Sequence, residues 1–133
     1  MHRTTLAATL LVVLALTPAA RAADEPVTAT LDEDGVQRAS IVLDSYSYTP
    51  GHLIVIAGKP VELTLTKEGF APHDFVIDDP AAGFTVKQNV GSDGVKVSFT
   101  PMNPGTYAIY CSKQAPFAGS HRKKGMEGVL EVR

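Results

Sequence analysis

From residue 40 onward, hydrophobic and polar positions alternate in short runs that are typical of β-strands rather than of a helix. The clearest runs lie at 61–66 and 95–100, where every second residue is apolar. This spacing places the apolar side chains on one face of a strand and the polar ones on the other. Shorter apolar runs follow the same pattern at 41–43, 46–48, 53–56, 75–77, 106–111 and 128–132.

Glycine and proline separate these runs, for example in Thr49-Pro50-Gly51 and in the segments 57–60, 91–94 and 101–105. About eight short strands divided by such turns predict an all-β fold, either a sandwich or a barrel. The segment 81–89 is ambiguous and could form a short helix or an irregular strand.

The first 22 residues have the pattern of a secretory signal peptide. Positive charge at Arg3 precedes an apolar run at 6–16, and Ala20-Arg21-Ala22 is a small-x-small cleavage site. The apolar run is shorter than the ~20 residues of a membrane span. We therefore expect cleavage after residue 22, a periplasmic protein and no remaining membrane span; the alternative is an uncleaved anchor.

Residues 23–133 have the length of a single domain. We expect a polar arm or edge strand at 23–38 and a single domain at 39–133. Without Arg3 and Arg21 the chain has 10 basic and 14 acidic residues. It has no basic stripe of the kind that binds nucleic acid, and we expect a monomer without a nucleic-acid partner.

Cys111 is the only cysteine, so it has no partner for a disulfide within the chain. Strand parity places it on the same face as Tyr107 and Ile109, so we expect it to point inward at the end of its strand. A buried thiolate needs a counter-charge, which a metal ion supplies. The alternative is an inert, buried thiol.

Two kinds of metal ligand accompany this thiol. Met126 follows it, whereas Met102 belongs to a turn separated from Cys111 by a strand of about 16 Å. Three histidines remain after the signal peptide for two ligand positions: His52 in an open turn, His73 before a strand, and His121. One thiolate, two imidazoles and a thioether are the ligands of a type 1 copper site.

The sequence resembles the cupredoxins, the small blue copper proteins. The resemblance rests on Pro72-His73-Asp74-Phe75, on Gly105-Thr106-Tyr107-Ala108-Ile109-Tyr110-Cys111, on the opening run 48–61, and most specifically on the ending 121–132 with its His-x-x-x-Gly-Met-x-Gly-x-Leu-x-Val pattern. It implies a Greek-key β-sandwich of about eight strands that binds one copper ion. The implied ligands are His73, Cys111, His121 and Met126.

The resemblance also implies a function. A cupredoxin cycles between Cu(I) and Cu(II) and passes single electrons to a redox partner such as a cytochrome or an oxidase, so we expect no enzymatic activity. The alternative is a periplasmic protein for copper resistance, storage or delivery that uses the same ligands. A structural zinc site and a metal-free interaction domain are weaker alternatives.

Two features depart from the family pattern. Nine residues, 112–120, separate Cys111 from His121, where the family usually has only a few, so this loop must fold back. Asp74 stands where the family often has Asn, and we expect Asp74 and Pro72 to lie in the layer that surrounds the ligands, where charge tunes the redox potential.

The long loop also suggests a partner surface. Pro116 and Phe117 form its apolar part. Basic residues flank this part in the sequence, namely Lys113, Arg122, Lys123 and Lys124. We hypothesise that this surface steers an acidic partner; the alternative is an ordinary solvated charge run.

Overall fold

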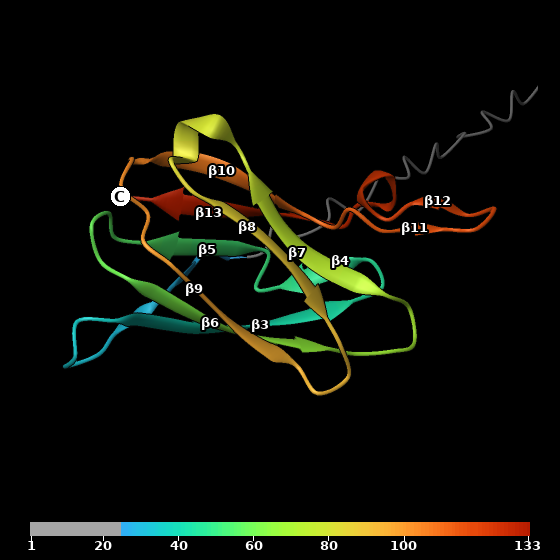
Figure 1. Ribbon diagram of the computed structural model, residues 1–133, viewed down its shortest axis with the longest axis horizontal. Helices are drawn as coiled ribbons and strands as arrows, with labels where there is room; N and C mark the ends of the chain where they lie inside the picture. Colours follow the sequence, from blue (N-terminus) through green and yellow to red (C-terminus); the bar gives the residue numbers. More distant parts are fainter. Residues whose placement is uncertain (1–24) are drawn as a thin grey trace, which may run out of the picture.

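The computed structural model describes residues 25–133, so the expected signal peptide at 1–22 lies outside the described residues. The described chain forms two facing β-sheets (Figure 1). The strands are β1 (Val27–Thr28), β2 (Thr30–Leu31), β3 (Gln37–Asp44), β4 (Ser47–Thr49), β5 (His52–Val55), β6 (Val61–Lys67), β7 (His73–Asp78), β8 (Thr85–Val90), β9 (Val95–Phe99), β10 (Gly105–Tyr110), β11 (Gln114–Ala115), β12 (Gly119–Ser120) and β13 (Glu127–Val132), with 3₁₀ helices η1 (Pro80–Ala82) and η2 (Arg122–Lys124).

The larger sheet has the strand order β1-β5-β13-β10-β7-β8, and the second has the order β2-β3-β6-β9 with β4 paired to β3. Strands β5 and β13 run parallel, as do β3 and β6, while β10 is antiparallel to both β13 and β7. Neither sheet closes on itself, so the predicted all-β fold is confirmed in its sandwich form.

The core lies between the two sheets and follows the alternation in the sequence. In β6, Val61, Leu63 and Leu65 are completely buried, whereas the residues between them are partly exposed. Tyr48 and Phe75 meet edge to face across the core with ring centroids 6.0 Å apart. Full burial of such side chains contributes about 1.5–3 kcal/mol each.

The N-terminal residues join both sheets, because β1 pairs with β5 and β2 pairs with β3. Just beyond them, the buried amide of Gln37 donates to the carbonyl of Ile56 at 2.9 Å and accepts from its N–H at 2.6 Å. The ambiguous segment 81–89 contains both expected elements, since η1 is followed by β8.

One end of the sandwich carries the residues of interest. Strand β7 begins there at His73, β10 ends beside Cys111, and β13 begins just after Met126. The hairpin β11–β12 projects from this end beyond the body of the sandwich (Figure 1). Within residues 25–133, no helix is both long and apolar enough to cross a membrane.

Candidate metal centre

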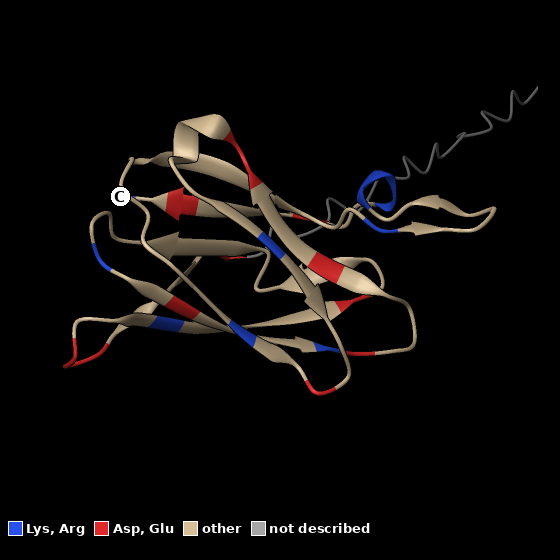
Figure 2. Cartoon of the chain, viewed as in Figure 1, with Lys and Arg blue, Asp and Glu red and all other residues tan. Residues whose placement is uncertain are grey.

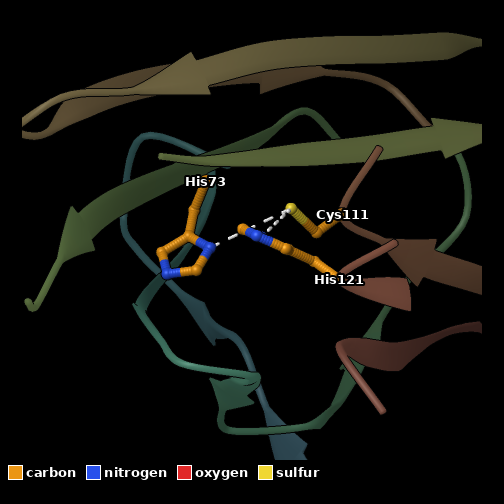
Figure 3. A group of neighbouring side chains, drawn as sticks. All are labelled: His73, Cys111 and His121. Atoms are coloured by element: carbon orange, nitrogen blue, oxygen red, sulfur yellow. Dashed lines mark hydrogen bonds between the residues drawn. The ribbon is translucent and has the colours of Figure 1, made fainter. Parts of the chain in front are cut away.

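Three potential metal ligands meet at this end of the sandwich. Donor atoms of His73, Cys111 and His121 all lie within 4.8 Å of one another. The sulfur of Cys111 is 3.6 Å from Nδ1 of His121 and 4.0 Å from Nδ1 of His73 (Figure 3). None of the three side chains is more than 1% exposed. Two imidazoles thus direct the same ring nitrogen toward one sulfur in a site closed to bulk water.

Backbone hydrogen bonds hold Met126 beside this group. The N–H of Cys111 donates to the carbonyl of Met126 at 3.2 Å, and the N–H of Met126 donates to the carbonyl of His121 at 3.1 Å. The Met126 side chain is completely buried, whereas Met102 is 62% exposed in the turn before β10. Of the two methionines in the described residues, Met126 is therefore the one held beside this group as a possible thioether donor.

Asp74 connects the strand of His73 to the residues that follow Cys111. Its buried carboxylate accepts hydrogen bonds from the N–H of Ser112, at 2.7 Å, and from the Ser112 hydroxyl, and Nζ of Lys113 lies 3.9 Å from it. The hydroxyl of Tyr48 donates to the Asp74 carbonyl at 2.7 Å. The Asp74 side chain, which was predicted to lie in the layer around the ligands, thus fixes the segment that follows Cys111. Pro72 directly precedes His73 and is exposed.

Burial determines the protonation of the three candidate ligands. It raises the pKa of the Cys111 thiol, although hydrogen bonds from the backbone amides of Asp74 and Lys113 to the sulfur act in the opposite direction. Burial also lowers the pKa of His73 and of His121, and each has a positively charged group nearby that adds to the effect. Both imidazoles are therefore neutral near pH 7, the form in which histidine binds a metal.

The donor set restricts the metal. Thiolate and imidazole donors suit copper and zinc, and a buried thioether as a fourth donor suits copper. In the described chain, Nε2 of His73 is the one buried side-chain nitrogen or oxygen without a hydrogen-bond partner, while its Nδ1 faces the Cys111 sulfur at 4.0 Å. The residues present therefore fit one copper ion.

Tyr46, in the turn between β3 and β4, covers the histidines. Its ring meets His121 edge-on with centroids 4.9 Å apart, and His73 at 6.5 Å. The ammonium of Lys124 lies 4.7 Å from the Tyr46 ring centroid and 3.3 Å from its hydroxyl. Tyr46 was not among the site residues predicted from the sequence. The available signal was its place two residues before buried Tyr48, a spacing that puts side chains on one face where the chain is extended.

Three other residues singled out in the sequence contribute no donor atom to this cluster, namely His52, Phe117 and Arg122. His52 does not belong to the cluster; it opens β5, and its Nε2 lies 2.9 Å from the carboxylate of Glu131. Phe117 is fully exposed at the tip of the β11–β12 hairpin. The guanidinium of Arg122 donates a hydrogen bond to the carboxylate of Glu127, and it lies 4.2 Å from the ring centroid of Tyr110.

Fold and site together define a class: a two-sheet sandwich with a buried cysteine and two buried histidines at one end, a donor set suited to copper. Residues 6–121 match the model of the cupredoxin-like domain family. The chain belongs to this family, as the resemblance predicted, and copper is the cofactor that the family and the donor set indicate.

Solved structures share the fold. The metal-binding domain of the Cu(I)-exporting P-type ATPase CopA of Streptococcus pneumoniae D39, with Cu(I), is 23% identical with a TM-score of 0.61, over 83% of this chain and 97% of that one. A mutant plastocyanin of a fern is 26% identical with a TM-score of 0.52, over 71% and 100%. Auracyanin from Roseiflexus castenholzii is 20% identical with a TM-score of 0.56, over 72% and 96%. No curated protein sequence matches this chain.

Proposed function

We propose that this protein is an exported type 1 copper protein that carries single electrons between redox partners. Its copper ligands are His73, Cys111, His121 and Met126. The observation that carries this proposal is the convergence of three buried donor groups within 4.8 Å, with His73 brought by the fold to Cys111 and His121 from 38 residues before the cysteine. Copper supplies the one-electron couple between Cu(I) and Cu(II).

The protein's contribution is a site that is already assembled. Both imidazoles are neutral and direct Nδ1 toward the sulfur, and Asp74 fixes the chain beyond Cys111. A buried group held by strands on either side changes little in geometry when its charge changes by one. That supports electron transfer, which is fastest when little reorganises, and no residue is proposed to act on a substrate.

Copper delivery or resistance is the second candidate. The fold likeness to a Cu(I)-bound domain of a copper exporter supports it. A delivery protein must release its ion to a client, whereas an electron carrier must retain it through many cycles. Complete burial of the three donor groups, with Tyr46 over the histidines, favours retention.

Retention and cycling can be measured on the same sample. The copper-loaded protein should show a reversible one-electron wave in protein-film voltammetry, and should keep its copper through repeated oxidation and reduction in the presence of a competing chelator. Loss of Cu(I) to the chelator within the time of a few redox cycles would favour delivery. We propose that the protein acts in the periplasm, after removal of residues 1–22.

A further inference from the structure

The β11–β12 hairpin carries a fully exposed aromatic residue at its tip. Strand β11 pairs with β12 through Gln114–Ser120 and Ala115–Gly119, and this pair belongs to neither sheet of the sandwich. Phe117, in the turn between them, is fully exposed. Nothing in the described chain covers its ring, although burial of a phenylalanine is strongly favourable.

The backbone at Phe117 is unfavourable as well. Its φ of 63° lies in the left-handed region, and it is the only non-glycine residue at positive φ among residues 25–133. A bulky side chain is rare there, and glycine would adopt the same conformation without strain. Such strain is concentrated at binding and switch regions of proteins. The tip thus keeps an aromatic ring in water on a backbone that would prefer glycine.

Charge is divided sharply between the hairpin region and the rest of the chain. Residues 112–126 contain four basic and no acidic residues, whereas the other described residues, 25–111 and 127–133, contain thirteen acidic and six basic ones. Helix η2, which has three consecutive basic residues, lies beside the hairpin (Figure 2). In the described chain, the ammonium of Lys123 has no hydrogen-bond or ion-pair partner.

The base of the hairpin is continuous with the metal centre. The N–H of His121 donates to the carbonyl of Lys113 at 2.9 Å, and this bond closes the base of the hairpin, next to the Gln114–Ser120 pair. The N–H of Ser112 bonds to Asp74 at 2.7 Å. A partner held at the hairpin is therefore held beside His121 and Cys111.

We propose that the β11–β12 hairpin is a docking arm, in which Phe117 inserts into an apolar recess of an acidic redox protein and the basic residues of 113–124 contact the carboxylates around that recess. This inference rests on the proposed function and specifies its partner. In each encounter one electron leaves Cu(I) for the partner's oxidised centre, for example a ferric haem, giving Cu(II) and a ferrous haem. Aromatic anchors in such pockets are typical hot spots of interfaces, and complementary charge accelerates association.

Electron-transfer kinetics of the copper-loaded protein test this arm. The probes are an acidic c-type cytochrome and hexacyanoferrate(III), which is too small to have an apolar recess. Phe117→Gly removes the anchor and relieves the left-handed strain. We expect the second-order rate constant with the cytochrome to fall about tenfold or more, while the rate with hexacyanoferrate stays unchanged. The control Met102→Ser removes another exposed apolar side chain, in the turn before β10, and should change neither rate.

Charge is tested separately. Lys123→Glu should slow the reaction with the acidic cytochrome about threefold to tenfold at low salt, and the difference should shrink as salt is added. Lys87→Glu, the same charge change at an exposed position of β8, is its control. Unchanged cytochrome kinetics in Phe117→Gly, or an equal loss in Met102→Ser, would overturn the docking arm.

Two further outcomes would also overturn the docking arm. If sedimentation shows that the wild-type protein self-associates through Phe117, the tip is an interface between two copies and the acidic partner is wrong. If the copper-loaded wild type reduces neither oxidant, the proposed function fails, and this inference fails with it. A wild type that reduces hexacyanoferrate, together with unchanged cytochrome kinetics in Phe117→Gly, would therefore mean that the arm fails while the electron carrier stands.

Discussion

Asp74 places a buried carboxylate beside the segment that carries Cys111. This carboxylate contacts Ser112 and Lys113, the two residues after Cys111. A buried carboxylate stabilises the more positive Cu(II) state over Cu(I). Its charge therefore lowers the reduction potential of the site, and the nearby ammonium of Lys113 offsets part of the effect.

We predict that Asp74→Asn raises the reduction potential. The side chain can still accept the Ser112 N–H bond but no longer carries a charge. The expected shift is on the order of tens of millivolts, because one partly screened charge near the site is removed. Redox titration measures it. Asp78→Asn, at the exposed far end of β7, is the control, and an equal shift there would show that the effect is not local.

Tyr46 covers the histidines, so its removal should open the centre. We predict that Tyr46→Ala increases the rate at which a thiol reagent modifies Cys111 in the metal-free protein. Tyr46→Phe keeps the ring over His121 and loses only the hydroxyl contact with Lys124. It should react at nearly the wild-type rate. Equal rates in all three proteins would show that the ring does not close the site.

At the residue scale, the alternation along the strand was sufficient to predict the orientation of Cys111. Strand parity predicted that it points inward, and it is completely buried with Ile109. The contacts of Asp74 with Ser112 were not predictable, because they join segments 38 residues apart. The position of Tyr46 over His121 escaped prediction for the same reason. Periodicity gives the face of a strand, but not which residues meet across a sandwich.

At the scale of elements, the loop between Cys111 and His121 is a hairpin whose base, not its tip, is attached to the metal centre. Its spacing predicted that the chain folds back, but its sequence Ala115-Pro116-Phe117-Ala118-Gly119 lacks the Asn-Gly or Asp-Gly signal of a tight hairpin. The structure closes it with a bond from the Ala118 N–H to the Ala115 carbonyl at 3.2 Å.

We predict that the tip can be removed without loss of the site. Replacing residues 115–119 by Asn-Gly leaves Gln114 and Ser120 paired across a two-residue turn. Because the bond between the His121 N–H and the Lys113 carbonyl is retained, the shortened protein should keep its copper spectrum. Its free energy of unfolding in urea should change by less than about 1 kcal/mol. Loss of the spectrum would show that the tip shapes the metal centre.

At the scale of the whole molecule, the sandwich keeps two neutral imidazoles and one thiol out of water, and this makes the stability of the metal-free protein depend on pH. The pKa values of His73 and His121 are lowered from 6.5 by burial, so in acid the unfolded state takes up protons before the folded state does. The pKa of Cys111 is raised above 9.0, so in alkali the unfolded state loses its proton first.

We therefore predict that the melting temperature of the metal-free protein falls as the pH drops below about 6.5, until both histidines are protonated in the folded state too. It should also fall as the pH rises above about 9. Calorimetry of the wild type and of a His73→Gln, His121→Gln double variant measures the acid limb. That limb should be flatter in the variant, and identical slopes would place its origin elsewhere.

The fold as a whole was the part most accessible from the sequence. Alternating runs such as Val61–Thr66 and the turns between them were enough for an all-β prediction, and β6 shows the expected pattern of burial. The order of strands and the pairing of β1 and β2 with different sheets depend on long-range contacts that no local pattern contains. The copper ligands remain a prediction supported by geometry.

Visible absorption spectroscopy of the protein with Cu(II) tests this central prediction most directly. One equivalent of Cu(II) added to residues 23–133 should produce an intense thiolate-to-copper band that saturates at one ion per chain, and Cys111→Ser should lose it. His52→Gln, outside the cluster, should keep the band. A colourless wild-type protein, or a Cys111→Ser variant with an unchanged band, would contradict the proposed site.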